Sequence, residues 1–148
     1  MSITIRTLAD RDFFSWLGLY EGYAEFKGTR LTDEKALRVW TWITNPNHEE
    51  NALVAVDDEG NLVGLAHFRE FARPLENDRG IFIDDLFVAP DSREQGTGTA
   101  LINAVRDNAA QRGIHVVNWV LTSDNDAAQR LYDSVGTRTQ WATYELTV

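Results

Sequence analysis

Hydrophobic residues recur at spacings of three and four in four stretches of the chain, and this period predicts four α-helices. Residues that commonly cap or end helices bound most of these stretches. The stretches run from Asp10 to Gly28, from Thr32 or Asp33 to the residue before Pro46, from Gly98 to Arg112 and from Asp124 to Val135. Their apolar faces, in order, are Phe13, Trp16, Leu17, Tyr20 and Ala24; Ala36, Leu37, Trp40 and Ile43; Leu101, Ala104 and Val105; and Ala128, Leu131, Tyr132 and Val135.

Alternating or β-branched apolar residues predict strands over residues 1–8, 52–56, 62–71, 80–88, 114–121 and 137–147. Residues 57–61 are typical of a hairpin turn, and Gly64 is expected to mark a bulge. The resulting order, β-α-α-β-β-β-α-β-α-β, contains no repeat and no linker. It predicts one α/β domain over residues 1–148, in which the step from strand 80–88 to strand 114–121 is a right-handed crossover.

Composition excludes several classes of function. The chain has 148 residues and no cysteine, so we expect a closed core without disulfides, and neither a thiolate nucleophile nor a thiolate metal site. The three histidines lack metal-ligand spacing, and no metal is expected. A net charge of −9 argues against nucleic acid as a partner and is compatible with a cationic substrate. Without a long apolar run or a secretory signal, we expect no membrane association and a cytoplasmic protein.

A glycine-rich turn follows strand 80–88 and opens the third helix. In its sequence, Arg93-Glu94-Gln95-Gly96-Thr97-Gly98, unpaired backbone N–H groups at a helix start predict an anion site. A P-loop would need lysine after the second glycine, where Thr99 stands. A dinucleotide-binding loop would need a third glycine or alanine, where Leu101 stands. Neither nucleotide motif fits this turn.

A second pattern, Asn-x-x-Ala-x-x-Leu-Tyr, runs from Asn125 to Tyr132 on the last predicted helix. Together with the Arg-x-x-Gly-x-Gly turn it resembles the GNAT superfamily of acyl-CoA-dependent N-acetyltransferases. The resemblance covers residues 79–146 and implies the GNAT fold, a mixed and mostly antiparallel central sheet flanked by about four helices. Residues 82–88 and 141–146 are most similar to the diamine/polyamine and histone/polyamine acetyltransferase branches.

The resemblance implies acetyl-CoA as co-substrate, bound where strand 80–88 separates from the following strand. It assigns backbone contacts with acyl-CoA to Leu86, Phe87 and Val88. Pyrophosphate binding is assigned to the backbone amides of Gln95, Gly96, Thr97, Gly98 and Thr99. Asn125 is expected to hydrogen-bond the pantetheine arm. Arg93 would either contact the cofactor or brace the loop. Glu94 departs from the family pattern, in which glycine or another small or basic residue is common, and we expect its carboxylate to point to solvent.

The resemblance also implies the catalytic groups. Tyr132 would be the general acid for the departing thiolate, a role that suits a phenol, although a core aromatic is the structural alternative. An acceptor amine titrates near pH 10.4 and must lose a proton before attack. Asp84 is the expected water-mediated base and Asp85 the substrate contact and second candidate base; a solvated acidic edge is the alternative. Their side chains should face opposite ways unless a bulge intervenes.

Aromatic and acidic residues supply candidates for the acceptor site, namely Tyr23, Glu25 and Trp119. Trp16, Tyr20 and Trp40 are expected in the core. We expect direct acetyl transfer to a primary amine in a ternary complex, with a polyamine or amino acid as acceptor. Protein lysine acetylation and a non-catalytic acyl-CoA sensor are the alternatives. The identity of the amine, the use of longer acyl groups, and a monomer or homodimer stay open.

Overall fold

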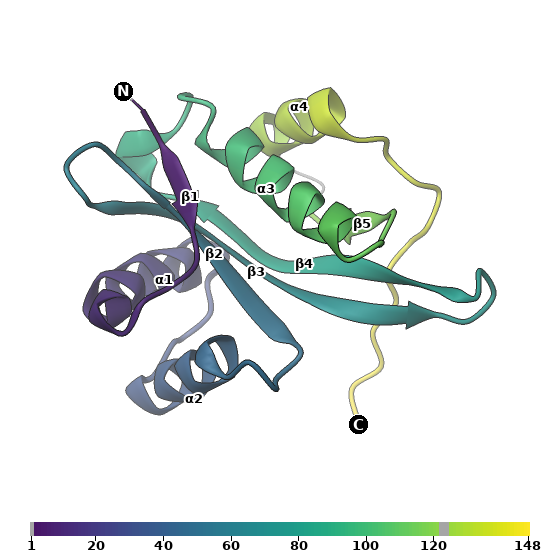
Figure 1. Cartoon of the computed structure of the whole chain (residues 1–148), viewed down its shortest axis with the longest axis horizontal. Coiled ribbons are helices and arrows are strands. Elements are labelled where there is room, and N and C mark those ends of the chain that lie inside the picture. Colours follow the sequence, from purple (N-terminus) through teal and green to yellow (C-terminus); the bar gives the residue numbers. More distant parts are fainter. Residues whose placement is uncertain (1, 122–124) are drawn as a thin grey trace.

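A five-stranded sheet in the order β1-β2-β3-β4-β5 forms the centre of the molecule (Figure 1). The computed structural model describes residues 2–121 and 125–148. The first three strand pairs are antiparallel and β4 pairs with β5 in parallel. The elements are β1 (Thr4–Arg6), α1 (Phe13–Lys27), α2 (Asp33–Thr44), β2 (Glu50–Val56), β3 (Leu62–Arg73), β4 (Asp78–Val88), α3 (Thr97–Gln111), β5 (Val117–Trp119) and α4 (Asp126–Val135).

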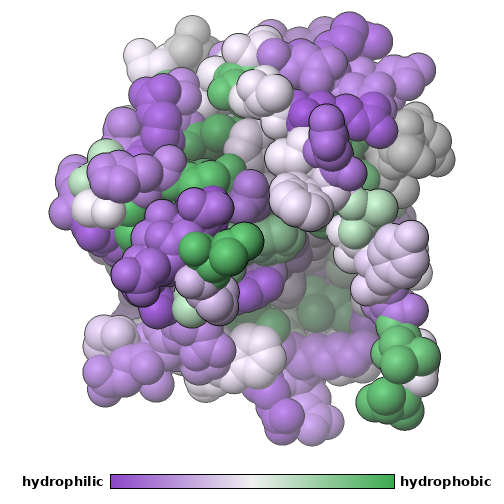
Figure 2. Space-filling view, turned by 90° about the vertical axis from the view of Figure 1, so that its right-hand side faces the viewer, coloured by the Kyte–Doolittle hydropathy of each residue, from purple (hydrophilic) through white to green (hydrophobic). Residues whose placement is uncertain are grey.

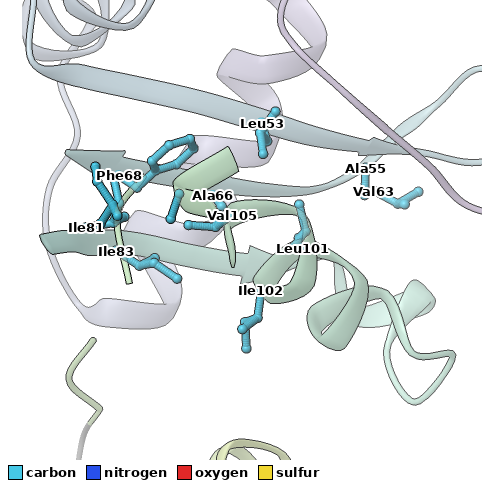
Figure 3. Packing of buried hydrophobic residues seen from close by; sticks show 12 residues of the cluster. Leu53, Ala55, Val63, Ala66, Phe68, Ile81, Ile83, Leu101, Ile102 and Val105 are labelled. Carbon is cyan, nitrogen blue, oxygen red and sulfur yellow. The ribbon is translucent and has the colours of Figure 1, made fainter. Parts of the chain in front are cut away.

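The helices lie in two layers, α1 and α2 on one face of the sheet and α3 and α4 on the other (Figure 1). Each face has its own core. On the α3 face, Phe68, Ile81, Ile83, Leu101 and Val105 belong to one buried cluster (Figure 3). On the α1 face, a second cluster is formed around fully buried Trp16. The protein therefore has a mixed α/β fold with a mostly antiparallel sheet and four α-helices among the described residues, as the sequence predicts.

Short polar contacts fix the helix ends. Thr32 Oγ1 accepts a hydrogen bond from the Lys35 N–H at 3.2 Å, which caps α2 as expected. The first helix begins later than predicted, because a 3₁₀ turn occupies Asp10–Asp12 and α1 starts at Phe13. Asp12 rather than Asp10 is the structural carboxylate there, since it accepts from the Ala9 N–H at 2.7 Å and pairs with Arg6. Asp124, the predicted start of α4, lies outside the described residues.

The predicted final strand is wrong. Residues 137–148 contain no strand, and Trp141, Tyr144 and Leu146 in this segment are 89%, 92% and 86% exposed. After α4 the chain runs past β5 and away from the sheet (Figure 1). Alternating apolar residues favour a strand only where a neighbouring strand pairs with them, and here none does. A cavity of about 810 Å³ lies between β5, α3, α4 and this segment.

The strand predicted over residues 114–121 is also shorter than expected, because β5 has three residues. It pairs with β4 only from Ile81 to Ile83. Directly after this ladder, the register of β3 against β4 shifts, so that Asp84 is an extra residue opposite His67. Beyond that bulge β4 pairs with β3 alone, and β4 and β5 diverge. Gly64, the predicted bulge, instead lies beside an irregularity at Val63.

Candidate active site

The divergence of β4 and β5 leaves one edge of β4 unpaired. The Ala89 N–H donates to the Val63 carbonyl at 2.8 Å, so by alternation Leu86 and Val88 direct their peptide groups away from β3 and toward the opening. Phe87 directs its peptide group to β3, so its backbone is not available at this edge. Its ring lies 5.7 Å from the ring of Tyr23 and is the part of Phe87 near the site. Figure 2 views the molecule from the side of the β3–β4 hairpin tip, which is the end of β4 opposite to Leu86 and Val88, and shows a recess with a hydrophobic floor at that end.

The glycine turn lies at the end of this edge and begins α3. Gly96 is the N-cap with a φ of 81°, so the N–H groups of Thr97, Gly98 and Thr99 belong to the first helical turn and have no intrahelical acceptor. The helix dipole adds positive potential at this point. A Cβ at Gly98 would lie 3.0 Å from Leu131 Cδ2, so glycine here lets α4 pack directly against the loop.

Arg93 stabilises the turn from the side. Its Nε–H donates to the Val88 carbonyl at 3.0 Å, and its guanidinium carbon lies 5.3 Å and 5.5 Å from the ring centres of Phe26 and Phe87. Of the two roles that the family resemblance implies for Arg93, these contacts support bracing. They also occupy the Val88 carbonyl, which leaves the Leu86 peptide group and the Val88 N–H for a ligand at this edge.

Glu94 adopts a left-handed backbone with a φ of 63°, a conformation that favours glycine. We expect Glu94→Gly to leave the free energy of unfolding equal or raise it by about 1 kcal/mol. Glycine removes the backbone strain at this position in the folded state, and this gain offsets the greater conformational entropy that glycine gives the unfolded chain. Removing the carboxylate beside an anion site should also lower the KM for acetyl-CoA about two- to fivefold. Glu94→Gln is the matched control: it should lower KM without raising stability in urea titrations. An unchanged KM in both variants would contradict this account of the loop.

The helix α4 presents two of the predicted site residues. Asn125 is its N-cap, and the Asn125 Oδ1 accepts from the Ala128 N–H at 3.1 Å, so its amide NH₂ is the group left for a ligand. Tyr132 packs edge-on against Trp119 with ring centres 5.5 Å apart. Burial raises the pKa of the Tyr132 phenol, which keeps it protonated at neutral pH. Trp119 thus contributes to the site by orienting Tyr132.

Asp84 and Asp85 lie on the same side of the sheet, because the bulge at Asp84 cancels the usual alternation. Arg69 Nε–H contacts both carboxylate oxygens of Asp84 at 3.2 Å and 3.1 Å. Tyr20 on α1 donates its hydroxyl to Asp85 Oδ2 at 3.0 Å, which places Asp85 on the face that α1 covers. The condition attached to the sequence prediction, a bulge, is therefore met.

Asp85 is the more enclosed of the two acids. Burial opposes its ionisation, but hydrogen bonds from His67 and from the hydroxyls of Tyr20 and Tyr23 outweigh burial and hold its pKa below the usual value. The pKa values of both tyrosines are raised, first by burial and then by the charge of Asp85. Smaller contributions to the raised pKa of Tyr23 come from Tyr132 and Asp84.

Two residues near the acids were not predicted from the sequence. Glu50, at the start of β2, is the strand partner of Arg69, and burial together with neighbouring Asp84 raises the pKa of Glu50 to about 9. His67 lies in the buried middle of β3 and bonds to Asp85 at 2.8 Å. No spacing in the sequence joins these residues to the acids, because strand register alone brings them together.

The other predicted residues divide as follows. Trp16 is buried in the core as expected, and Tyr20 stacks on it at 5.1 Å while also reaching Asp85. Glu25 lies on the exposed side of α1, two residues beyond Tyr23, and helical geometry turns it away from the acids. Within residues 2–121 and 125–148 no group of three potential metal ligands occurs. No described helix is long and apolar enough to cross a membrane.

Comparison with known proteins decides the family. Residues 14–137 match the model of the acetyltransferase (GNAT) family. The chain belongs to the GNAT family. It is 27% identical over 144 residues to the D-amino-acid N-acetyltransferase HPA3 of Saccharomyces cerevisiae, which covers 97% of this chain and 89% of that protein. It is 33% identical over 84 residues to the L-methionine sulfoximine/L-methionine sulfone acetyltransferase of Pseudomonas aeruginosa, which covers 57% of this chain and 48% of that protein.

Solved GNAT structures have the same fold. A ribosomal-protein-alanine N-acetyltransferase from Brucella melitensis biovar Abortus superposes with a TM-score of 0.84 at 24% identity, covering 99% of this chain and 100% of that one. The protein AAC(6')-Iy, in complex with the bisubstrate analogue CoA-S-monomethyl-acetylneamine, gives a TM-score of 0.86 at 18% identity, covering 100% and 99%. These likenesses establish the fold.

As a GNAT protein, the chain is an N-acetyltransferase that uses acetyl-CoA and acts on an amine. The structure fits that co-substrate. The unpaired N–H groups of the α3 start suit a pyrophosphate, and the free edge of β4 suits the amide-bearing pantetheine arm. Thr97 Oγ1 is buried at this helix start without a hydrogen-bond partner among the described residues. The diamine/polyamine branch suggested by residues 82–88 is a finer assignment than the family match gives.

Proposed function

We propose that this protein acetylates a small primary amine, an amino acid or a polyamine, by direct transfer in a ternary complex. One observation carries the proposal: the bulge at Asp84 brings Asp84 and Asp85 to one face of β4, beside the stretch of β4 that β5 leaves unpaired. The candidate proton acceptors therefore lie beside this edge, and Tyr132, the candidate proton donor, lies against Trp119 at the end of β5. The acids and the net charge of −9 favour a cationic acceptor.

In this proposal each site residue has one role in the reaction. Acetyl-CoA supplies the activated acetyl group as a thioester. Asp85 holds the acceptor ammonium, and Asp84 takes its proton directly or through water, so that the neutral nitrogen attacks. The C–N bond forms as the C–S bond breaks, and Tyr132 gives its proton to the departing sulfur. The peptide groups of β4 and the loop N–H groups fix the thioester in place, which lowers the entropic cost of the encounter.

The relatives support the amino-acid class in particular. The yeast relative is named for D-amino acids and the Pseudomonas relative for methionine sulfoximine and sulfone. Both names describe acceptors with an amine close to a second polar group. Protein lysine is the second candidate, because its side chain offers the same primary ammonium to Asp85.

Calorimetry and thiol release test the proposal together. Titration with acetyl-CoA should show one saturable site per chain. Release of free CoA should then be followed across D- and L-amino acids, polyamines and a lysine-containing peptide. We expect acceleration by a free amino acid or polyamine. Acceleration by the peptide alone would favour protein lysine, binding without release for any amine would favour an acyl-CoA sensor, and no binding would refute the proposal.

A further inference from the structure

His67 is a buried histidine with both ring nitrogens hydrogen-bonded. Its exposed fraction is 1%. Trp16 Nε1–H donates to His67 Nε2 at 3.1 Å, and His67 Nδ1 lies 2.8 Å from Asp85 Oδ2. The three residues come from α1, β3 and β4, so this chain of contacts joins three elements beneath the site.

The donor chemistry of tryptophan fixes the direction of the chain. An indole N–H can only donate, so Nε2 of His67 must accept and carries no hydrogen. The imidazole is therefore neutral, its hydrogen is on Nδ1, and that hydrogen is donated to Asp85. Adding a proton to Nε2 would require the Trp16 contact to break inside the core. His67 is held in one tautomer.

The same contacts determine how Asp85 is presented. Its Oδ2 accepts from both His67 and the Tyr20 hydroxyl, at 2.8 Å and 3.0 Å. With Oδ2 occupied, Oδ1 is the oxygen left for a ligand. The ring of Tyr20 also packs edge-on against His67, with centres 4.9 Å apart. The carboxylate is fixed in rotation as well as in position.

Other charged groups lie around this chain. On the α1 side Asp85 meets the tyrosines at positions 20 and 23. Arg69 pairs with Asp84, and the strand partner of Arg69 is Glu50, which its raised pKa keeps protonated at neutral pH. Of these groups, His67 and Tyr20 are hydrogen-bonded to Asp85. Since the tyrosines approach from the helix, His67 is the support that reaches Asp85 from the sheet itself.

We propose that His67 is a positioning residue that, backed by Trp16, holds the Asp85 carboxylate ionised with Oδ2 occupied and Oδ1 turned to the acceptor ammonium. This inference rests on the proposed function, because it assigns the acceptor amine to Asp85. It predicts an effect on the acceptor and none on acetyl-CoA, which binds at the β4 edge and the α3 start. A merely structural histidine would affect both substrates through stability.

Two amide substitutions of His67 test the roles of its two ring nitrogens separately. His67→Asn puts an amide nitrogen near the place of Nδ1 and can donate to Asp85, whereas His67→Gln puts its amide near Nε2 and leaves Asp85 without that donor. We expect His67→Gln to raise the KM for the amine about tenfold, as loss of one hydrogen bond to a charged group implies, with the KM for acetyl-CoA unchanged. His67→Asn should recover most of the amine KM. Equal amine KM values in the two variants would overturn the proposal.

Two NMR measurements on the protein without substrate avoid dependence on activity. Imidazole ¹⁵N spectra of the wild type should show hydrogen on Nδ1 of His67 and none on Nε2. Titration of the Asp85 carboxyl ¹³C signal should move to higher pH in His67→Gln relative to wild type and to His67→Asn. A hydrogen on Nε2, or an Asp85 titration identical in the three proteins, would overturn the inference. If no amine is acetylated, the proposed function fails while these spectra still decide whether His67 controls Asp85.

Discussion

Replacing Tyr132 by phenylalanine is expected to lower kcat about 100-fold, at the lower end of what a general acid contributes, while the dissociation constant for acetyl-CoA stays within about twofold. The ring of Tyr132 packs on Trp119, and phenylalanine keeps that contact. No described residue is hydrogen-bonded to its hydroxyl, so removing the oxygen leaves no buried partner unsatisfied. Stopped-flow release of CoA, with calorimetry for binding, measures both quantities.

Tyr144→Phe is the matched control for this experiment. Tyr144 is 92% exposed on the C-terminal segment, so losing its hydroxyl should change neither kcat nor binding. If Tyr132→Phe turns over at the wild-type rate, Tyr132 is not the acid and the leaving thiolate departs without a proton from α4. If binding is lost along with turnover, the hydroxyl serves the cofactor instead.

The second large effect concerns stability against pH. We expect Glu50→Gln to raise the free energy of unfolding by about 1–2 kcal/mol at pH 8.5 and to change it little at pH 4.5, after allowing for partial solvent screening of this side chain. The folded protein raises the pKa of Glu50 to about 9, first through burial and then through Asp84. Between the unfolded and folded pKa values the native state binds the extra proton, so this group makes stability fall as pH rises. Glutamine removes that dependence.

Urea titrations at several pH values measure the effect, with Glu49→Gln as control. Glu49 is the adjacent residue, and its side chain is 65% exposed and lies 3.7 Å from His48, an exposed contact, so its substitution should give only a small pH-dependent difference. A Glu50→Gln difference that is constant from pH 4.5 to 8.5 would show that folding does not raise the pKa of Glu50. Asp84 would then lack a neighbour with which to share a proton.

The helices and the order of elements could be predicted because each depends on local pattern. Thr32 caps α2 and Gly28 ends α1 in a left-handed conformation, as residue type alone indicates. The glycine turn likewise lies between a strand and a helix, where its motif requires it. The prediction of a strand over residues 137–147 was wrong, because alternation of apolar residues does not indicate whether the edge of another strand lies within reach.

The candidate site could be predicted only where its residues are adjacent in the sequence. Asp84 and Asp85 were found from their position on a strand, but their common orientation depends on a register shift opposite His67. Glu50 came from another strand, and its charge state depends on burial beside Asp84. Such features arise from long-range pairing, and a single sequence holds no local signal for them.

The three-residue ladder between β4 and β5 has a mechanical meaning. The acids belong to the continuous antiparallel part of the sheet, whereas Asn125 and Tyr132 belong to α4, which packs on the core of the α3 face through Tyr132 and Val135 and on Gly98 through Leu131. The candidate proton acceptors and the candidate proton donor thus lie on different elements, and side-chain packing rather than a long strand ladder fixes the distance between them.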